Sequence, residues 1–454
     1  MTTQGVSLRI EPAELLRRLP RREGTFLLDG GSALSWGSGE ALLGCEPTCV
    51  VRVYGSGEVE IASGGNVRRS CEDPLLLLDR LAERPEGDDA AEGPSGGLLC
   101  ALGYDLGRWI ERLPSAPEDD LGLPLVFAAV HPWVLRYSYC DRRYTLRSRQ
   151  LSAAELREVA QRIEEAGSSA SAEPVQLSRR EVRSNFTVEC YLRIVRRALE
   201  YIAAGDIYQV NLAQRFTVPL QEPPAALFTR LLRQHPMPYA AYVDCGDTAL
   251  VSGSPECFLR RDGERLSTFP IKGTRPRGKT PEQDARMCAE LAASAKDRAE
   301  HLMIVDLERN DLGRVCECGT IAAPMRATVR SFSTLHHLES EVSGILRPGT
   351  SWSDILRATF PGGSITGAPK IRAMEIIDEL EPVARRFYTG AIGLVDGSDW
   401  ARFNVAIRTA VATESGVAYH SGGGIVADSR PDEEYAETVL KARAFLDALH
   451  GELR

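Results

Sequence analysis

Hydrophobic and polar positions recur along the chain with two different periods, which predict a mixture of helices and strands. In residues 187–204 the apolar side chains stand three or four positions apart, as a helix requires, at Val188, Tyr191, Ile194, Val195, Ala198 and Ile202. Gly205 follows where a left-handed cap would end that helix. Residues 207–216 instead alternate, with Gln209, Asn211 and Arg215 opposite the apolar Tyr208, Val210, Leu212 and Phe216. That polar face predicts a strand that lies at the surface or lines a pocket.

Two further apolar runs each carry one cation. Residues 266–274 and 403–411 have strand-like composition, and they contain Lys272 and Arg408 respectively. A lone cation in a strand is usually a side chain that reaches to solvent or a member of a structural ion pair. A functional role for either cation therefore depends on the residues around it.

Two stretches have the composition of linkers, residues 83–97 and residues 164–174. The second is the better boundary, because short strand-like runs precede it and longer helices and strands follow it. We expect an N-terminal domain over residues 1–175 and a catalytic domain over residues 181–454.

The composition is that of an ordinary globular protein, with 454 residues, 43% of them hydrophobic and 26% charged. The 54 Lys and Arg against 63 Asp and Glu give a net charge of −9, so no diffuse positive field would hold nucleic acid or an anionic membrane. The N-terminus lacks a secretory signal and the 11 Cys are scattered, which favours a reducing cytoplasm. Cys316 and Cys318 form the one close pair, without further zinc ligands at suitable spacing.

Two acidic pairs lie on predicted helices. Asp297 and Glu300 fall three apart in a helix expected over residues 281–303, whose packed stripe would be Cys288, Ala292, Ala295, Ala299 and Leu302. Ser429 is expected to cap a second helix beginning near Pro431, on which Glu434 and Glu437 share a face with Lys441. Carboxylates at this spacing suit Mg²⁺, although each pair alone is more often a solvated helix face.

Two glycine-rich segments are candidate anion sites. Residues 361–370 read P-G-G-S-I-T-G-A-P-K and lead into a helix, and residues 421–428 read S-G-G-G-I-V-A-D. Free backbone N–H groups in such turns can hold a carboxylate or phosphate, although a glycine run is more often only a tight turn. Neither segment has the spacing of a nucleotide-binding loop.

Glu256 and Lys272 are candidates for acid and base chemistry. They lie sixteen residues apart, and they converge if their segments pair as adjacent strands. A desolvated Lys loses its proton more readily and becomes a nucleophile, whereas a desolvated Glu keeps its proton and can act as an acid. His337 is either a neutral hydrogen-bonding group or a satisfied core histidine.

Several segments, in one order across residues 184–449, resemble the chorismate-utilising enzymes. They include G-D-I-Y-Q-V-N-L-A-Q-R-F, S-P-E-C-F-L, P-I-K-G-T-R-P-R-G, K-D-R-A-E-H-L-M-I-V-D-L-E-R-N-D-L, P-G-G-S-I-T-G-A-P-K and G-G-G-I-V-A-D-S. Weaker matches are L-L-D-G-G at residues 27–31 and A-L-G-Y-D-L-G-R at residues 101–108. The resemblance implies an α+β fold in which two largely antiparallel β-sheets pack as a sandwich with helices outside.

The resemblance also implies roles for individual residues. Glu300 and Glu437 would bind Mg²⁺, with Asp297 and Glu434 beside them. Glu256 would be the general acid, and His337 an active-site hydrogen-bonding residue. The implied substrate-binding set is Arg408, Tyr388, Ser364, Gly422, Gly423, Gly424, Asn211, Gln209, Thr274 and Lys441.

Lys272 implies the branch of the family that aminates chorismate at C4, toward p-aminobenzoate and folate, through a lysine-bound intermediate. Gln209 stands where relatives that add water carry a Lys, and an amide cannot act as that base. No segment resembles a glutaminase, so ammonia would come from a separate class I glutamine amidotransferase subunit or from free ammonium. The alternatives are a relative that aminates C2 to form anthranilate and an inactive sensor of chorismate or tryptophan.

Overall fold

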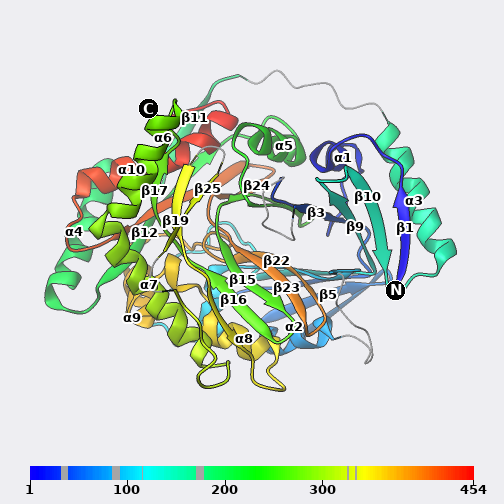
Figure 1. Ribbon diagram of the computed structural model, residues 1–454, viewed down its shortest axis with the longest axis horizontal. Coiled ribbons are helices and arrows are strands. Elements are labelled where there is room, and N and C mark those ends of the chain that lie inside the picture. Colours follow the sequence, from blue (N-terminus) through cyan, green and yellow to red (C-terminus); the bar gives the residue numbers. More distant parts are fainter. Residues whose placement is uncertain are drawn as a thin grey trace.

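Two large β-sheets form the centre of the molecule (Figure 1). The computed structural model describes residues 1–31, 39–83, 93–114, 116–169, 178–324, 327–332 and 335–453. The thirteen-stranded sheet follows the order β1 (Thr2–Val6), β10 (Arg143–Ser148), β9 (Trp133–Ser138), β3 (Glu40–Gly44), β2 (Phe26–Asp29), β13 (Tyr239–Asp244), β14 (Ala249–Ser254), β24 (Thr409–Thr413), β25 (Gly416–Ile425), β12 (Gln209–Val218), β11 (Arg180–Ser184) and β26 (Gly451–Leu453), and β21 (Gly367–Ala368) also pairs with β12.

The second large sheet has ten strands, and a third sheet has three. The ten-stranded sheet follows the order β20 (Val342–Ile345), β16 (Arg265–Phe269), β15 (Cys257–Asp262), β23 (Trp400–Val405), β22 (Ala391–Asp396), β7 (Gly97–Leu102), β8 (Val126–His131), β4 (Cys49–Val53), β5 (Glu58–Ser63) and β6 (Asn66–Cys71). The small sheet contains β17 (Ile271–Pro276), β19 (Leu335–Glu339) and β18 (Thr328–Ser331). Neighbouring strands are antiparallel in all three sheets, apart from the parallel pair of β11 and β26.

The sheets pack face to face because their strands alternate between two apolar cores. In β2, Phe26 and Leu28 point to the core between the sheets, whereas Leu27 points to the outer face of the thirteen-stranded sheet. In β22, Ile392 belongs to the core between the sheets, and Val395 belongs to the outer core of the ten-stranded sheet.

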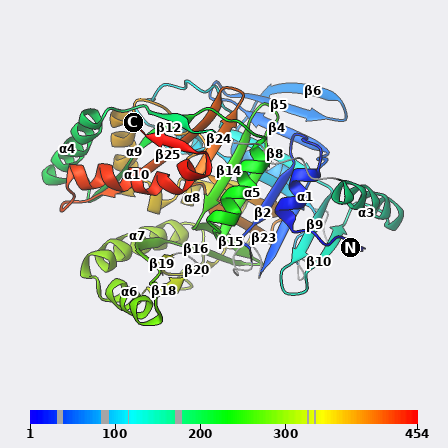
Figure 2. The ribbon, with the colours of Figure 1, turned by 90° about the horizontal axis from the view of Figure 1, so that it is seen from above.

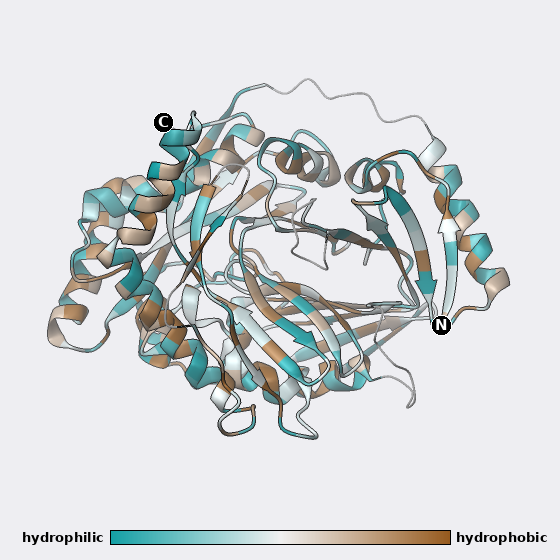
Figure 3. Cartoon of the chain, viewed as in Figure 1, coloured by the Kyte–Doolittle hydropathy of each residue, from teal (hydrophilic) through white to brown (hydrophobic). Residues whose placement is uncertain are grey.

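Helices cover both outer faces (Figures 1 and 2). The thirteen-stranded sheet packs against α1 (Pro12–Arg18), α3 (Ala153–Ser168), α5 (Pro224–Gln234) and α10 (Pro431–Ala448). The core outside the ten-stranded sheet includes α2 (Pro74–Ala82), α7 (Ala295–Gly313) and α8 (Trp352–Thr359). The same core continues to α4 (Val188–Ala204) and α9 (Lys370–Leu380), which pack against β12 of the thirteen-stranded sheet. Apolar residues concentrate on the strands and on the inner faces of helices (Figure 3). The expected α+β sandwich is confirmed.

The remaining helical segments are short or peripheral. They are α6 (Pro281–Ala293), which packs on the three-stranded sheet, and the 3₁₀ turns η1 (Tyr104–Trp109) and η2 (Gly363–Ile365). None of the helices in the described part of the chain has the length and apolar composition needed to cross a bilayer.

The predictions for residues 187–216 are confirmed apart from Tyr208, which precedes strand β12 and is 72% exposed. Helix α4 follows the cap residue Thr187, and Gly205 ends it with a φ of +83°. Strand β12 is buried on both faces, since Gln209 and Val210 are both fully buried. Of the two alternatives, the polar face therefore lines the interior rather than the surface.

Each predicted strand that carries a cation is in fact two strands. In residues 266–274, strand β16 ends just before Pro270, and the chain continues as β17 in the three-stranded sheet. Proline has no N–H to donate to the ladder. The run at residues 403–411 leaves β23 and enters β24 in the other large sheet, and Arg408 just before β24 has a φ of +49°. Lys272 and Arg408 thus lie where the chain passes between sheets, which an apolar run in the sequence does not reveal.

The single helix expected over residues 281–303 is wrong. Ser294 separates α6 from α7, and its side chain accepts a hydrogen bond from the N–H of Asp297, as an N-cap does. The expected packed stripe is also wrong, because Leu302 is 57% exposed. The buried face of α7 instead contains His301, Ile304, Val305, Glu308, Asp311 and Leu312.

The expected cap of α10 is wrong as well. Arg430 occupies the N-cap position without a side-chain bond to the helix. Ser429 instead accepts a hydrogen bond from the N–H of Val426 and donates one to Glu434 at 2.6 Å. The hydroxyl is therefore used to hold a carboxylate rather than a backbone N–H.

Both large sheets combine strands from before residue 175 with strands from after residue 181. Residues 164–168 of the expected linker end helix α3, whereas residues 170–177 and residues 84–92 lie outside the described part of the chain. The proposed domain boundary stays a prediction about chain organisation.

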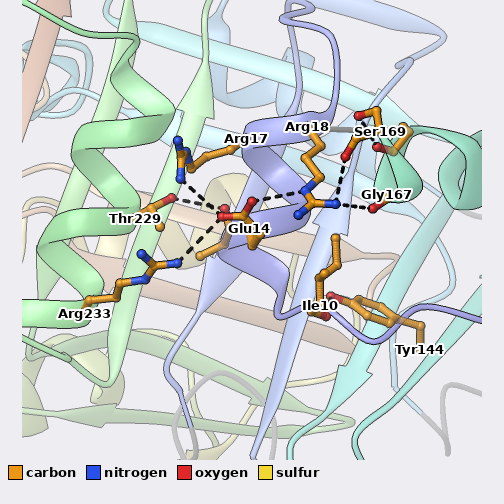
Figure 4. Close-up of polar contacts among 11 residues, drawn as sticks. Ile10, Glu14, Arg17, Arg18, Tyr144, Gly167, Ser169, Thr229 and Arg233 are labelled. Atoms are coloured by element: carbon orange, nitrogen blue, oxygen red, sulfur yellow. Dashed lines mark hydrogen bonds and ion pairs between the residues drawn. The ribbon is translucent and has the colours of Figure 1, made fainter. Parts of the chain in front are cut away.

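A polar cluster around Glu14 joins early and late segments (Figure 4). Glu14 on α1 pairs with Arg18 at 3.1 Å and with Arg233 on α5 at 3.7 Å. Arg18 also donates to the carbonyl oxygen of Gly167 at the end of α3. Helix α1 is thereby fixed between two helices that are distant in sequence.

We expect Phe403→Ala to lower the free energy of unfolding by about 3–5 kcal/mol, because the ring is 2% exposed in the middle of the ten-stranded sheet and its loss leaves a cavity. Urea unfolding followed by tryptophan fluorescence measures this. Val67→Ala is the control, since Val67 on edge strand β6 is 61% exposed and should change stability by less than about 0.5 kcal/mol. Equal losses of unfolding free energy in the two variants would contradict the placement of Phe403 in the core and of Val67 on the edge strand.

Candidate active site

Three segments distant in sequence meet at Ser364, in the 3₁₀ turn η2. The carbonyl oxygen of Ser364 accepts hydrogen bonds from Lys272 Nζ at 3.3 Å and from Asn211 Nδ2 at 3.2 Å. The hydroxyl of Ser364 and the backbone N–H of Ile271 both hydrogen-bond to the Glu256 carboxylate. Lys272 and Glu256 therefore converge at one point, although the strands that pair, β15 and β16, do not themselves contain either residue.

Burial shifts the proton affinities of both groups in useful directions. Burial raises the pKa of Glu256 to about 7, against the opposing effects of the Ser364 hydroxyl and the Lys272 charge. Burial lowers the pKa of Lys272, and the charges of Glu256 and Glu300 oppose that shift. A carboxyl that can be protonated near neutral pH thus lies beside an amine that loses its proton more easily than in water.

The acidic residues of two helices surround this cluster. Burial raises the pKa of Glu300 on α7, and the charge of Glu437 on α10 raises it further. Glu437 pairs with Lys441 at 2.6 Å, and Lys441 Nζ also donates to the carbonyl oxygen of Gly422. A Cβ atom on Gly423 would lie 3.4 Å from Glu434 and 3.6 Å from Glu437, so the two carboxylates lie over the glycine strand.

Asp297 is turned toward a different partner. Its carboxylate pairs with Arg275 of β17 at 3.0 Å. Within the described residues, no three His, Cys, Asp or Glu side chains gather as a preformed metal site. Mg²⁺ needs only one or two protein carboxylates when water and substrate oxygens complete its shell. Glu300 and Glu437 fit that need, because they lie on different helices close enough for the charge of Glu437 to act on Glu300, and Glu300 has no ion pair among the described residues.

His337 on β19 is buried opposite Thr274 of β17. Its Nδ1 lies 3.0 Å from the hydroxyl of Thr274 and 3.3 Å from the carbonyl oxygen of Gly273. Burial and the nearby charge of Arg408 lower its pKa to about 4, so the imidazole is neutral at physiological pH. Arg408 is partly buried, its Nη1 lies 3.5 Å from the sulfur of Met237, and desolvation lowers the pKa of its guanidinium. It has no acidic partner among the described residues and can therefore pair with an anionic ligand.

The glycine segment differs from the expected turn. Gly422, Gly423 and Gly424 lie inside strand β25, and none has a positive φ, so the predicted turn is wrong. Their role as carboxylate binders stays a prediction. Tyr388 is buried, and its ring stacks on that of His420 in β25 with 5.1 Å between ring centroids.

Gln209 on β12 is a buried amide with unused hydrogen-bonding capacity. Neither its Oε1 nor its Nε2 has a partner among the described residues, although the side chain is fully buried. A Cβ atom on Gly424 would lie 2.3 Å from that Nε2, so only glycine leaves room for the amide there. Buried polar groups normally have partners, and a polar ligand or a water molecule would supply one.

Sequence reasoning missed the ion pair that holds the cluster in place. Arg385 and Glu381 are both buried and pair at 2.6 Å. Arg385 also donates to the carbonyl oxygens of Asn211 and Ile365, which lie next to the hydrogen bond between Asn211 and Ser364. The i, i+4 spacing of Glu381 and Arg385 is a weak signal, because most such pairs are exposed.

Sequence reasoning also missed two residues on the buried face of α7. His301 donates to or accepts from Ser340 at 2.7 Å, and burial with the charge of Lys272 lowers its pKa to about 4. Glu308 accepts a hydrogen bond from Thr268 at 2.9 Å, and burial with the charge of Glu256 raises its pKa to about 8. His301 and Glu308 lie three or four residues from the apolar Ile304 and Val305, so all four share one helix face. That spacing was the signal in the sequence that could have found them.

Fold and cluster together define a two-sheet enzyme with one buried polar site. The chain belongs to the family of chorismate binding enzymes, whose sequence model matches residues 25–447. It is 38% identical over 415 residues to aminodeoxychorismate synthase component 1 of Escherichia coli (strain K12), which covers 89% of this chain and 88% of that protein. It is 42% identical over 358 residues to anthranilate synthase component 1 of Thermus thermophilus, which covers 78% of this chain and 77% of that protein.

A solved structure shows the same fold. Anthranilate synthase component I of Streptococcus pneumoniae aligns with a TM-score of 0.81 at 29% identity, over 90% of this chain and 92% of the other. The resemblance seen in the sequence is confirmed for the family. The two activities named for the relatives occur at similar identity, so the comparisons do not choose between them.

We expect Arg385→Met to destabilise the protein by about 3–5 kcal/mol, because it leaves Glu381 buried without its partner. Chemical unfolding measures the loss. Arg197→Met is the control, since the Arg197–Glu200 pair on α4 is exposed and solvent screens it, so its loss should change stability little. A loss no larger than that of the control would show that Arg385 does not hold the site.

Stability should also depend on the protonation of Glu256. Its pKa rises from 4.5 to about 7 on folding, so its stabilising effect is present below pH 4.5 and is lost as the pH rises through 7. Glu256→Gln stays neutral, and we expect it to lose less stability than the wild type over this interval. Urea unfolding at a series of pH values tests this, with exposed Glu200→Gln as control. Parallel curves for Glu256→Gln and the wild type would contradict the shift.

Proposed function

We propose that this chain is the synthase subunit of aminodeoxychorismate synthase, which converts chorismate and ammonia to 4-amino-4-deoxychorismate for p-aminobenzoate and folate synthesis. The observation that carries the proposal is the position of Lys272. Its ammonium is partly buried, donates a hydrogen bond to the carbonyl oxygen of Ser364, and lies close enough to Glu256, Glu300 and Lys441 for their charges to act on it. A surface lysine would not support this function.

The chemistry assigned to this arrangement uses both groups. The neutral amine of Lys272 attacks C2 of the ring, and Glu256 donates its proton to the C4 hydroxyl as it leaves as water. Ammonia then attacks C4, and the bond from C2 to the lysine nitrogen breaks, so that the lysine leaves as a neutral amine. The proton that the new C4 ammonium group gives up returns Glu256 to its protonated state. The low proton affinity of Lys272 and the high proton affinity of Glu256 support these roles.

Arg408 is placed to hold one carboxylate of the substrate. The amides of Gln209 and Asn211 on β12 supply neutral hydrogen-bonding groups, and His337 is a neutral group within hydrogen-bonding distance of Thr274. Gln209 also supports amination over addition of water, because an amide cannot remove a proton from water. Tyr388, Ser364, the glycines of β25 and Lys441 complete the proposed binding set.

Glu300 and Glu437 are the proposed ligands of Mg²⁺, with Glu434 and Asp297 beside them. When bound, the ion would offset the charge of a dicarboxylate substrate. In the structure, Lys441 forms an ion pair with Glu437, and Arg275 forms one with Asp297.

The proposed source of ammonia is a separate class I glutamine amidotransferase subunit. The names of several relatives contain the words component 1, which implies a second component in those proteins. Anthranilate formation is the rival activity, and the similarity to the Thermus thermophilus enzyme favours keeping it under test.

We expect the purified chain with chorismate, Mg²⁺ and ammonium to form 4-amino-4-deoxychorismate, identified by mass and retention time. Lys272→Ala should lower the rate of this reaction by at least about 100-fold, because the nucleophile is removed. Lys279→Ala is the matched control, as Lys279 follows in the same segment and is exposed.

Anthranilate as the product, detected by its fluorescence, would replace the proposed activity with the rival one. Unchanged formation of the 4-amino product by Lys272→Ala would remove the lysine from the mechanism. Without ammonium, the wild type should gain the mass of chorismate less water, and Lys272→Ala should not.

A further inference from the structure

Two passages of the chain between the large sheets are joined backbone to backbone. Residues 255–256 connect β14 of the thirteen-stranded sheet to β15 of the ten-stranded sheet, and residues 406–408 connect β23 back to β24 (Figure 2). The first passage ends at Glu256 and the second ends at Arg408. The backbone N–H of Val405, the last residue of β23, donates to the carbonyl oxygen of Glu256 at 3.0 Å. The proposed acid and the proposed carboxylate-binding cation therefore lie on adjoining segments.

The hydroxyl of Ser254, the last residue of β14, joins these two passages a second time. Its Oγ donates to the carbonyl oxygen of Val405 at 2.6 Å and accepts a hydrogen bond from the backbone N–H of Glu256 at 3.2 Å. The carbonyl oxygen of Glu256 lies farther from the Oγ, at 3.3 Å, and the hydroxyl has only one proton to donate. Because Ser254 is 0% exposed, water does not compete for either bond.

The carbonyl oxygen of Val405 is the point at which the chain turns toward Arg408. It also accepts a hydrogen bond from the backbone N–H of Ile407 at 2.7 Å, which closes a tight turn. Arg408 follows with a φ of +49°, a left-handed conformation that is unfavourable for a residue other than glycine unless its surroundings hold it. The N–H of Gly253 donates to the carbonyl oxygen of Arg408 at 2.9 Å. The end of β14 thus holds both ends of this turn.

The same end of β14 fixes the backbone of Glu256. Its N–H is bound by the Ser254 hydroxyl and its carbonyl oxygen by the N–H of Val405. Pro255 lies between the two residues, and its ring restricts φ. The Glu256 carboxylate then reaches the hydroxyl of Ser364. A shift of the Glu256 backbone would therefore move the carboxylate away from the rest of the site.

We propose that Ser254 is a positioning residue, whose hydroxyl fixes the backbone of Glu256 against the turn that leads to Arg408 and thereby aligns the acid with the carboxylate-binding guanidinium. The roles of Glu256 and Arg408 in this inference rest on the proposed function, whereas the contacts of Ser254 do not. A misplacement of about 1 Å can slow an enzyme by about 100-fold, so loss of a hydroxyl that touches no substrate can be measured in the reaction.

The first test is chorismate consumption in the presence of Mg²⁺ and ammonium, which does not depend on the identity of the product. In Ser254→Ala, displacement of the acid should lower kcat and displacement of the guanidinium should raise KM, each by about 10-fold. Ser148→Ala is the matched control. Ser148 is also 0% exposed, and its hydroxyl donates to the carbonyl oxygen of Pro132 and accepts from the N–H of Gln150. The control should keep both constants, and wild-type constants in Ser254→Ala would overturn the proposal.

Two variant backgrounds separate positioning from a general loss of structure. In Glu256→Gln the acid is already absent, so adding Ser254→Ala should lower kcat by less than about twofold but still raise KM. In Arg408→Gln the guanidinium is absent, so adding Ser254→Ala should leave KM nearly unchanged but still lower kcat. A merely structural role for Ser254 would give the same further losses in both backgrounds, and that result would reject the proposal.

Ser254→Cys serves if Ser254→Ala does not fold. A thiol is a weaker donor and acceptor than a hydroxyl, so kcat and KM should change in the same directions by smaller factors. Constants equal to those of the wild type in Ser254→Cys would also count against the role of Ser254 and overturn it.

Identification of the product separates this inference from the proposed function. Formation of anthranilate, with the expected separate effects on kcat and KM, would retain the role of Ser254 and reject the proposed function. Formation of the 4-amino product without those separate effects would reject the role of Ser254 alone. A chain that consumes no chorismate would reject both.

Discussion

The carbonyl oxygen of Ser364 is the point on which the site depends. It accepts hydrogen bonds from a lysine of β17 and from an amide of β12, and these strands belong to different sheets. The Arg385–Glu381 pair fixes the backbone on both sides of this contact. One turn thereby sets the positions of the amine, the amide and, through its own hydroxyl, the Glu256 carboxyl. The site is a property of this junction rather than of any single element.

Burial of these groups is what gives them their chemistry. A lysine or a glutamate at the surface keeps its ordinary proton affinity, and in water neither group would be prepared for nucleophilic or acid chemistry at neutral pH. The sandwich shields both groups from water, and Ser364 gives each of them a hydrogen-bond partner. Carboxylates from α7 and α10 then supply negative charge that keeps the buried cation tolerable.

Local sequence patterns predicted secondary structure well where core packing and backbone sterics favoured the same conformation. The stripe of α4 and the left-handed Gly205 were readable because core packing and backbone sterics agree there. Prediction failed where a long-range contact decided. Ser294 divides the helix expected over residues 281–303, and the small apolar residues of its expected stripe face solvent while His301 and Glu308 face the core. Periodicity identified a helix face there, but the wrong one, because alanines carry little apolar area.

The sequence by itself determined the family, the residue types of the site and most of the separate elements, since motif order and apolar periodicity are written along the chain. Tertiary structure alone decided that Lys272 and Arg408 lie where the chain passes between sheets, that the glycines of residues 422–424 belong to a strand, and that Glu308 lies on the buried face of α7. The physical reason is that a hydrophobic pattern reports whether a face is buried but not what it is buried against. Proton affinity depends on those neighbours, which come from segments far away in sequence.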